Sequence, residues 1–246
     1  MAGGRSSVTF RAMSILGGFD ELHRRRTLSE LARAAALPLS TAHRLLAELE
    51  SLQMVERDAD GLYVIGRRLW QLGTLAPVQR ELRDVAVPAM QDLYEATHEN
   101  VHLAIRQGTS ALYIERIHGK HSVGVASRVG RPLPLHATGV GKVLLAYADD
   151  ATREQALREL KTVTRYTMTE RGRVLRELAN VRRNGYAKSN EEMTLGTCAI
   201  AVPVYSQAGE VTAALGLVTS TVRRDLIRFV PALVVAAASI TRALPA

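Results

Sequence analysis

Two helical segments separated by a proline constrain the fold of this chain more than any other feature. Between residues 28 and 35, apolar side chains recur at the i, i+3, i+4, i+7 spacing of one buried helix face. Pro38 disfavours a helical residue before it, so the first helix has to end there. A second apolar stripe follows at Ala42, Leu45, Leu46, Leu49 and Leu52. Two short helices joined by a tight turn are typical of a helix-turn-helix, but an ordinary packed helical hairpin has the same pattern.

The segment after the second helix separates these two interpretations. Residues 54–66 hold two short strand-like runs around Asp60-Gly61, and this dipeptide favours a tight hairpin turn that needs positive φ. A β-hairpin wing behind a helical hairpin is typical of a winged helix-turn-helix, whereas an ordinary hairpin has no reason to be followed by a wing. We expect a further helix over residues 8–19, ended by paired glycines. Its inward-facing side chains would be Phe10, Met13, Ile15, Leu16 and Phe19.

Candidate DNA contacts lie at the start of the second helix, because that end of a recognition helix reaches base edges in the major groove. They are Ser40, Thr41, His43 and Arg44. Arg44 can bond guanine O6 and N7 in a bidentate way, or it can pair with Glu48 one turn later on the same face. Arg57, on the wing, is a candidate for a phosphate or the minor groove. Thr27 and Ser29 can cap the first helix, and both also count among the DNA-binding candidates.

Charge supports DNA binding only weakly. The net charge is +8, but residues 1–80 hold 11 Lys and Arg against 8 Asp and Glu, and the rest of the chain holds 21 against 16. The basic excess is therefore not concentrated on the candidate DNA-binding part, and the motif has to support the prediction. The three arginines at 24–26 are interpreted as a loop that is solvated or touches phosphates.

Composition indicates a globular protein of the cytoplasm. No apolar run approaches the roughly 20 residues that span a bilayer, so we expect no membrane partner. The single cysteine, Cys198, excludes an internal disulfide and fits a reducing compartment. A ligand role for this thiol is less favoured than a buried structural one.

Three parts are expected along the chain. Residues 1–66 form the winged helix-turn-helix, and residues 67–80 a linker helix that ends near Pro77. The apolar side chains of that helix would form a dimer contact or pack against their own domain. Residues 81–246 alternate hairpins with helices, which indicates an α+β domain with a largely antiparallel sheet. The helices are expected over 82–99, 139–148, 151–160, 170–183 and 225–244, and the strands or extended segments over 101–105, 111–117, 122–129, 132–137, 197–205 and 211–219.

Taken together, these stretches resemble the IclR-type transcriptional regulators. The matching residues are Leu-Ser-Glu-Leu-Ala-Arg (28–33), Leu-Pro-Leu-Ser-Thr-Ala-His-Arg-Leu-Leu (37–46), Arg-Pro-Leu-Pro-Leu-His-Ala-Thr-Gly-Val-Gly-Lys-Val-Leu-Leu-Ala (131–146), Arg-Arg-Asn-Gly-Tyr-Ala (182–187), Glu-Glu-Met-Thr-Leu-Gly (191–196) and Ile-Ala-Val-Pro-Val (200–204). The specificity lies in the ordered set, which runs from about residue 8 to the C-terminus. The resemblance implies a GAF-like effector domain, a dimer or dimer of dimers on a palindromic double-stranded DNA operator, a small organic acid as effector, and no cofactor.

A helix that begins at residues 137–141 is the candidate carboxylate site. Its residues are Ala137, Thr138, Gly139, Val140 and Gly141. Free N–H groups and the positive end of the helix dipole favour an anion there, although a routine glycine-rich helix start has the same spacing. The resemblance favours the first interpretation, because this helix start is similar to the carboxylate-binding edge of the family.

The opposite wall of the expected pocket departs from the pattern of glyoxylate-type members. Ser189 stands at an Asp position, Thr197 at a Leu position, Ala199 at a Cys position, and Gly216 and Val218 at two Ser positions. The loss of a carboxylate and two hydroxyls removes hydrogen-bond partners and adds room. We therefore expect a larger and less polar effector than a two- or three-carbon acid, namely an aromatic carboxylate.

Enzymatic interpretations are weaker, and no catalytic or metal residues are proposed. Residues 98–102 match the H-E-x-x-H zinc pattern, but they straddle a helix end and a strand start, where two histidines do not converge. Gly141-Lys142-Val143 lacks the earlier glycine and the Ser/Thr of a P-loop. Glu191-Glu192 is interpreted as a solvated loop. The alternative function that remains is a small-molecule-binding or enzymatic α+β domain whose helical hairpin is purely structural.

Overall fold

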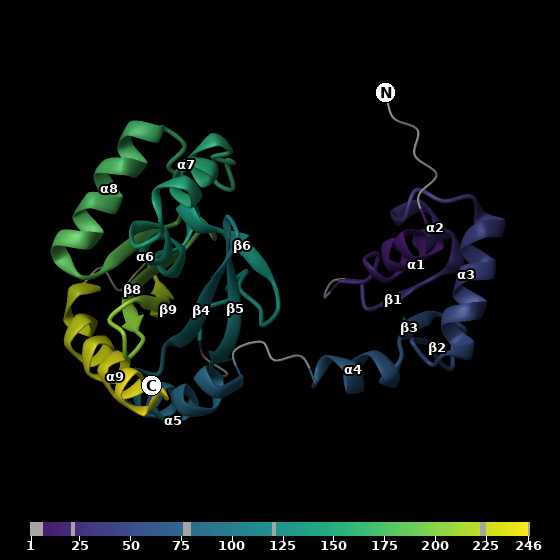
Figure 1. Cartoon of the computed structure of the whole chain (residues 1–246), viewed down its shortest axis with the longest axis horizontal. Coiled ribbons are helices and arrows are strands. Elements are labelled where there is room, and N and C mark those ends of the chain that lie inside the picture. Colours follow the sequence, from purple (N-terminus) through teal and green to yellow (C-terminus); the bar gives the residue numbers. More distant parts are fainter. Residues whose placement is uncertain (1–6, 21–22, 76–79, 120–121, 222–224, 246) are drawn as a thin grey trace. The chain divides into compact units, whose positions relative to one another are not determined.

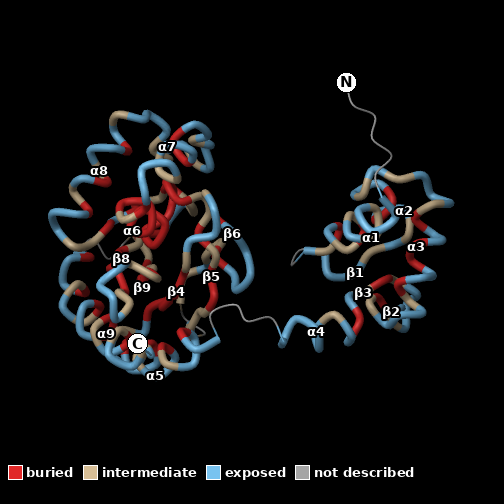
Figure 2. Tube along the Cα trace, in the orientation of Figure 1, coloured by how far each residue is buried: buried red, intermediate tan, exposed pale blue. Residues whose placement is uncertain are grey.

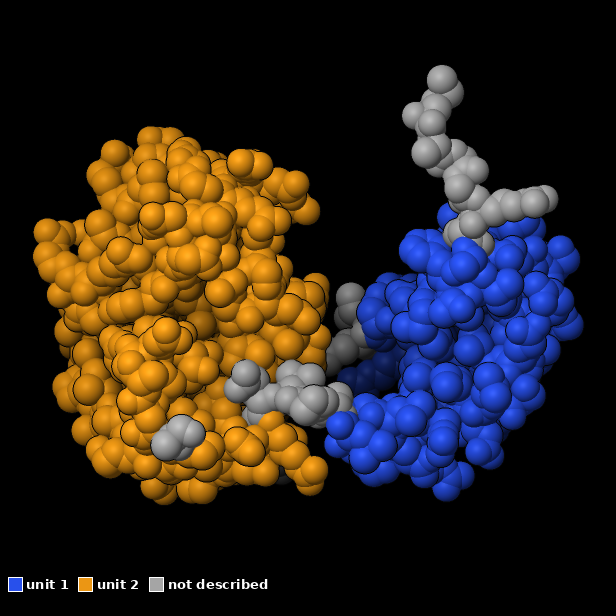
Figure 3. Space-filling model, in the orientation of Figure 1, with its two compact units in different colours: residues 1–77 blue, residues 78–246 orange. Residues whose placement is uncertain are grey.

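A computed structural model describes residues 7–20, 23–75, 80–119, 122–221 and 225–245. The chain divides into two compact units, residues 1–77 and residues 78–246 (Figure 3). Each unit has its own hydrophobic core, and each is described by itself below.

The first unit is built on a helical hairpin. Helix α1 (Val8–Leu16) packs with α2 (Leu28–Ala34) and α3 (Leu39–Ser51) (Figure 1). Between α2 and α3, Ala36 takes a left-handed conformation with φ 52°, and the Leu37 N–H donates to the Ala32 carbonyl at 2.9 Å. This bond closes the C-terminal turn of α2 before Pro38 opens α3, as the proline break predicts.

A small antiparallel sheet completes the winged helix-turn-helix. Its strands β1 (Arg25–Arg26), β2 (Val55–Arg57) and β3 (Tyr63–Ile65) lie in the order β1-β3-β2. The wing turn holds Gly61 at φ 76°, in agreement with the Asp-Gly signal. The interpretation of residues 24–26 as a loop is wrong for Arg25 and Arg26, because these two residues form strand β1, which pairs with β3. Arg25 is held there by ion pairs with Asp58 and Asp60.

Part of the predicted core of this unit is exposed. Ile15 is buried against the apolar faces of α2 and α3, but Phe10 is 64% exposed and Met13 is 60% exposed. Leu52, expected on the inner side of α3, is 59% exposed because the helix ends at Ser51. The remaining buried side chains of the hairpin follow the predicted stripes: Leu31, Ala32, Ala42, Leu45, Leu46 and Leu49.

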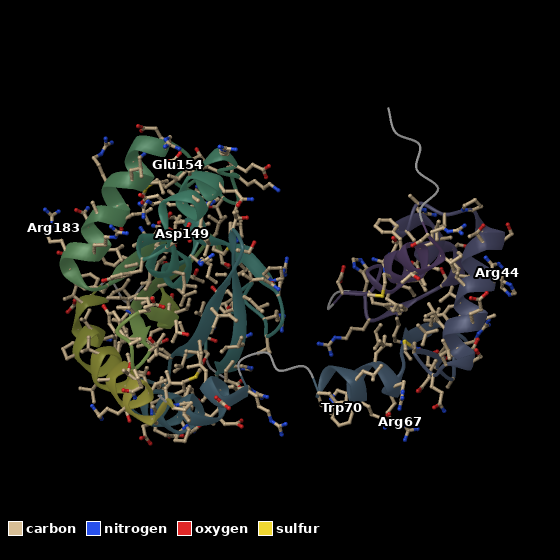
Figure 4. All side chains as sticks on the ribbon, in the orientation of Figure 1. Arg44, Arg67, Trp70, Asp149, Glu154 and Arg183 are labelled. Carbon is tan, nitrogen blue, oxygen red and sulfur yellow. The ribbon has the colours of Figure 1, made fainter. Side chains whose placement is uncertain are left out.

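Helix α4 (Arg67–Gly73) follows the wing and is apolar on its surface. Trp70, which is labelled in Figure 4, is 69% exposed. Leu75, two residues beyond the end of the helix, is 75% exposed. These side chains do not pack into the core of their own unit. The linker helix expected over residues 67–80 is shorter than predicted, because α4 ends at Gly73. Pro77, its expected end, lies outside the described residues.

The second unit is organised around an antiparallel sheet of the order β6-β5-β4-β9-β8-β7. The strands are β4 (Asn100–Gln107), β5 (Ser110–Ile117), β6 (Pro132–Pro134), β7 (Ala187–Asn190), β8 (Thr197–Tyr205) and β9 (Val211–Ser220). The expected strands over 101–105 and 111–117 form the hairpin β4–β5, and those over 197–205 and 211–219 form the hairpin β8–β9. The whole chain is thus α+β, as expected.

Helices cover both faces of this sheet. One core joins the sheet to α5 (Arg80–Thr97) and α9 (Val230–Ala243), and the other joins it to α6 (Gly139–Ala146), α7 (Asp150–Arg158) and α8 (Arg171–Asn184). Short 3₁₀ turns precede α6 (η1, Leu135–Ala137) and α9 (η2, Ile227–Phe229). Helix α6 is buried along its whole length (Figure 2). No helix in the described part of the chain is both long enough and apolar enough to cross a bilayer.

Two predictions in this unit are wrong in detail. Residues 122–129 do not form a strand, and the extended segment expected over 132–137 ends at Pro134, where the 3₁₀ turn begins. Strand β7 at the sheet edge was not expected, because its residues are Ala-Lys-Ser-Asn and carry little strand signal.

Candidate functional site

The start of α3 presents the predicted DNA-facing side chains to solvent. Ser40, His43 and Arg44 are exposed, and Thr41 is half-buried. Figure 4 shows Arg44 projecting from α3 away from the rest of its unit. Because Ala42 and Leu45 on the opposite side are buried, this face can enter a groove without disturbing the core.

Both predicted DNA-binding arginines have partners within the chain. Arg44 Nη1 donates to Glu48 Oε1 at 2.7 Å, which is the surface pair weighed as its alternative role. Arg57 lies over the ring of Tyr63, with 4.6 Å from its Cζ to the ring centroid, and its Nη2 donates to the Tyr63 hydroxyl at 2.5 Å. The Arg44 pair is exposed to solvent, so exchanging it for phosphate or base oxygens costs little, whereas the Arg57 contact is part-buried because the Tyr63 side chain is buried.

Thr27 and Ser29 have different local roles. The Thr27 side chain accepts the Glu30 N–H, and the Glu30 carboxylate accepts the Thr27 N–H, which makes a complete capping box at the start of α2. These hydrogen bonds to Thr27 lower the pKa of the Glu30 carboxyl. Ser29 lies on the first turn of α2 with an exposed side chain and makes no cap.

A pocket in the second unit lies between the start of α6 and the sheet. Its walls are formed by 19 residues, namely His102, Tyr113, Val125, Ala126, Ser127, Leu133, Thr138, Gly139, Val140, Ser189, Met193, Thr194, Thr197, Ala199, Ile200, Ala201, Gly216, Leu217 and Val218. None of these described residues is Asp, Glu, Lys or Arg. The pocket is therefore lined by apolar side chains with a few neutral polar groups.

The start of α6 supplies the polar edge of this pocket. Thr138 caps the helix by accepting the Gly141 N–H at 3.0 Å, so that donor is already used. The N–H groups of Gly139 and Val140 belong to the first turn, whose donors have no partner within a helix. Ala137 and Gly141, both predicted to face the effector, do not line the pocket. A Cβ at Gly141 would lie 2.3 Å from the Leu135 carbonyl oxygen, so this glycine serves the tight turn.

The structure brings together all five of the predicted positions on the opposite wall. Ser189, Thr197, Ala199, Gly216 and Val218 line the pocket from β7, β8 and β9. The Ser189 hydroxyl donates to the Ala137 carbonyl at 3.1 Å, and the Thr197 hydroxyl donates to the Thr194 carbonyl at 2.7 Å. Because both hydroxyl protons are already engaged, this wall is even less polar than its sequence indicates.

Two buried pairs beside the sheet were missed by sequence reasoning. Lys142 and Glu192 form an ion pair at 2.5 Å, so the interpretation of Glu191-Glu192 as a solvated loop is wrong for Glu192, which is 6% exposed. His102 Nε2 and Ser127 Oγ lie 3.1 Å apart at the pocket. One signal was available for the first pair, because a lysine inside the apolar run Val140–Ala146 requires a buried partner.

The remaining chemical candidates lie apart from one another. His98 takes φ 55° just beyond α5, whereas His102 is on β4 and is bonded to Ser127. Over the described ranges, no cluster of His, Cys, Asp or Glu has the geometry to hold a metal. Cys198 is buried with its thiol against the Asn190 side-chain oxygen at 2.8 Å, and burial raises its pKa.

Comparison with known proteins gives consistent matches over both units. Residues 75–242 match the bacterial transcriptional regulator IclR C-terminal family, and residues 8–59 match the IclR helix-turn-helix domain. The chain is 34% identical to the HTH-type transcriptional regulator XynR of Escherichia coli K12 over 87% of its own length and 86% of the relative's. It is 33% identical to KdgR of Dickeya chrysanthemi over 88% and 72%.

Solved structures show the same architecture. An IclR homolog of Microbacterium hydrocarbonoxydans, in complex with 4-hydroxybenzoate, has a TM-score of 0.90 at 34% identity and covers 97% of this chain and 99% of its own. The Thermotoga maritima IclR has a TM-score of 0.78 at 28% identity, with coverage of 95% and 97%.

Proposed function

The chain belongs to the IclR family of bacterial transcriptional regulators, and we propose that a small aromatic carboxylate is the effector that sets its affinity for operator DNA. It is a DNA-binding regulator with an effector domain rather than an enzyme. In this proposal residues 1–66 read DNA, residues 67–80 link the domains, and residues 81–246 bind effector in the cytoplasm.

The carrying observation is the uncharged pocket beneath the start of α6. A carboxylate needs hydrogen-bond donors, and the N–H groups of Gly139 and Val140 supply them together with the helix dipole. The rest of the lining gives an apolar body its contacts, because Ala199, Gly216 and Val218 carry no polar side-chain atom. The 4-hydroxybenzoate bound by the Microbacterium homolog is of this chemical class.

The operator is read by paired copies of the helix-turn-helix. Ser40, Thr41, His43 and Arg44 face the bases and phosphates, while Thr27, Ser29 and Arg57 lie near the backbone. The exposed Trp70, Leu72 and Leu75 lie within six residues of one another after the wing and support contact with a second copy, because a group of exposed apolar side chains is typical of an interaction surface. A dimer or dimer of dimers presents two reading heads, which fits a palindromic operator.

Calorimetric titration of the full chain tests the effector class. Benzoate and 4-hydroxybenzoate are expected to bind, whereas glyoxylate and pyruvate are expected to bind at least about tenfold more weakly, since they leave the apolar walls uncovered. Tight binding of glyoxylate or pyruvate without binding of either aromatic acid would overturn the proposal.

A further inference from the structure

One end of the pocket carries a buried polar pair that the carboxylate site does not use. His102 on β4 is 2% exposed, Ser127 in the loop between β5 and β6 is 4% exposed, and their Nε2 and Oγ atoms lie 3.1 Å apart. The imidazole packs edge-on against the Tyr113 ring, with 5.4 Å between the ring centroids. All three residues line the pocket.

His102 is held in its neutral form. Burial lowers its pKa to about 3, and the nearby positive charge of Arg116 acts in the same direction. A neutral imidazole offers one N–H donor and one nitrogen acceptor. The Tyr113 phenol is also neutral, because burial raises its pKa, and its hydroxyl is engaged by Thr138. This end of the pocket can therefore exchange hydrogen bonds with an uncharged group, whereas a second carboxylate would be desolvated beside two neutral side chains.

The pair lies on the far side of the pocket from the carboxylate donors. Gly139 lies over β8, where an added Cβ would be 3.3 Å from the Ala199 Cβ. His102 is opposite Gly216 of β9, so the two positions share one sheet face. The Val140 side chain of α6 packs over this glycine, where an added Cβ would be 2.9 Å from Val140 Cγ1, so an aromatic ring between the two ends would lie against Val140. From β8 across β9 to β4 is about 10 Å, which is the span of one aromatic ring with a polar group at each end.

We propose that His102 and Ser127 bind an uncharged hydroxyl on the effector ring, opposite its carboxylate, and so select hydroxyaromatic acids over unsubstituted ones. This inference rests on the proposed function, in which the effector is an aromatic carboxylate. The ring hydroxyl of the effector can donate its proton to the acceptor nitrogen of His102, or it can accept a hydrogen bond from whichever of His102 and Ser127 acts as the donor. In either arrangement the polar atoms of the pair keep hydrogen-bond partners.

Calorimetric titration of the full chain with benzoate, 3-hydroxybenzoate, 4-hydroxybenzoate and terephthalate tests the inference. The wild-type chain is expected to bind 4-hydroxybenzoate about tenfold more tightly than benzoate, the effect of one buried hydrogen bond. The 3-hydroxy isomer is expected to bind between these two. Terephthalate is expected to bind more weakly than benzoate, because its second carboxylate would be desolvated beside a neutral imidazole and hydroxyl, and the nearby Arg116 guanidinium already donates to the Ser127 carbonyl and to Asn100 Oδ1.

Two variants assign the effect to the pair. His102→Phe and Ser127→Ala are expected to bring the affinities for benzoate and 4-hydroxybenzoate to within about threefold of each other. Ser206→Ala is the matched control, because Ser206 lies in the turn between β8 and β9 and does not line the pocket. It is expected to keep the wild-type preference. If His102→Phe does not fold, Ser127→Ala removes the partner oxygen with little loss of volume.

The outcomes separate this inference from the proposed function. Equal wild-type affinities for benzoate and 4-hydroxybenzoate, or a preference that persists in both variants, would refute the role of the pair while leaving an aromatic effector intact. Binding of glyoxylate without any aromatic acid would instead remove the proposed function itself.

Discussion

Lys142 Nζ lies 2.5 Å from Glu192 Oε1 in the interior of the second unit, with both side chains almost fully buried. The same ammonium donates to the Lys188 carbonyl at 3.0 Å. Lys142 belongs to α6, and Glu192 immediately precedes Met193 and Thr194 of the pocket wall. The ion pair therefore ties helix α6 to the segment that contains Met193 and Thr194, and so connects two walls of the effector pocket.

Loss of the lysine charge is expected to destabilise the second unit strongly. Burial raises the pKa of Glu192, and the charge and hydrogen bond of Lys142 oppose this most strongly, ahead of the backbone hydrogen bonds from Asn190 and Met168. Lys142→Met leaves a buried carboxylate without its cation, so we expect a loss of about 3–5 kcal/mol in the free energy of unfolding.

Chemical denaturation of the full chain, followed by far-ultraviolet circular dichroism, measures this effect. The double variant Lys142→Met/Glu192→Leu is expected to recover most of the loss, since it removes both charges. A single variant as stable as the wild type would show that the pair does not hold these walls together.

Acid is expected to weaken the fold through His102. Its folded-state pKa of about 3 lies below the ordinary 6.5, so the unfolded chain binds a proton that the folded chain does not. Stability is thus fully present above pH 6.5 and decreases as pH falls towards 3. Between pH 7 and pH 5 this group alone contributes a loss of about 2 kcal/mol.

The free energy of unfolding of the wild type and of His102→Phe is measured by chemical denaturation at pH 7 and at pH 5. The comparison checks whether His102 causes the loss of stability. The variant is expected to lose about 2 kcal/mol less than the wild type. His136, whose pKa is also lowered by burial, remains in both chains and contributes equally. An identical pH dependence in the two chains would contradict it.

Arg44 is expected to contribute to sequence selection. Arg44→Ala should weaken operator binding by about 1–3 kcal/mol and relax the preference at one base pair. Glu48→Gln is the matched control, because it removes the intramolecular partner of Arg44 and leaves the guanidinium free for DNA. Fluorescence anisotropy titrations with operator variants measure both effects. Unchanged affinity and unchanged site preference for Arg44→Ala would exclude a base contact.

A charge at Trp70 is expected to weaken self-association. Trp70→Glu replaces an exposed apolar side chain, so the proposed dimer should dissociate at concentrations at which the wild type is expected to stay paired. Gln71→Glu places the same charge on the neighbouring exposed position and is expected to have little effect. Sedimentation equilibrium distinguishes them. If Trp70→Glu associates as the wild type does, the dimer contact lies elsewhere.

Local patterns were sufficient to predict most of the helices and the two long hairpins. The stripes of α2 and α3 and the turn at Gly61 are properties of a few neighbouring residues, so they can be read directly. The errors at Phe10 and Met13 have a different cause. Both side chains are exposed, and an exposed apolar side chain has the same sequence signal as one that packs in the core.

The pocket was only partly predictable for a physical reason. The family resemblance pointed to the α6 start and the opposite wall, but the pairs Lys142–Glu192 and His102–Ser127 join residues that are far apart in sequence. Their contacts depend on strand order and register. In the sequence, His102 stands out only as part of a zinc-like pattern. Its position opposite Gly216 depends on the pairing of β4 with β9, which cannot be read from the sequence alone.

Coupling between effector and operator is the central claim, and one titration tests it most directly. Operator binding by the full chain is measured by fluorescence anisotropy without 4-hydroxybenzoate and at saturating 4-hydroxybenzoate. We predict that the operator affinity changes by about tenfold, and that saturating operator changes the affinity for the acid by the same factor. An operator affinity that is the same with the acid bound and with the acid absent would contradict it.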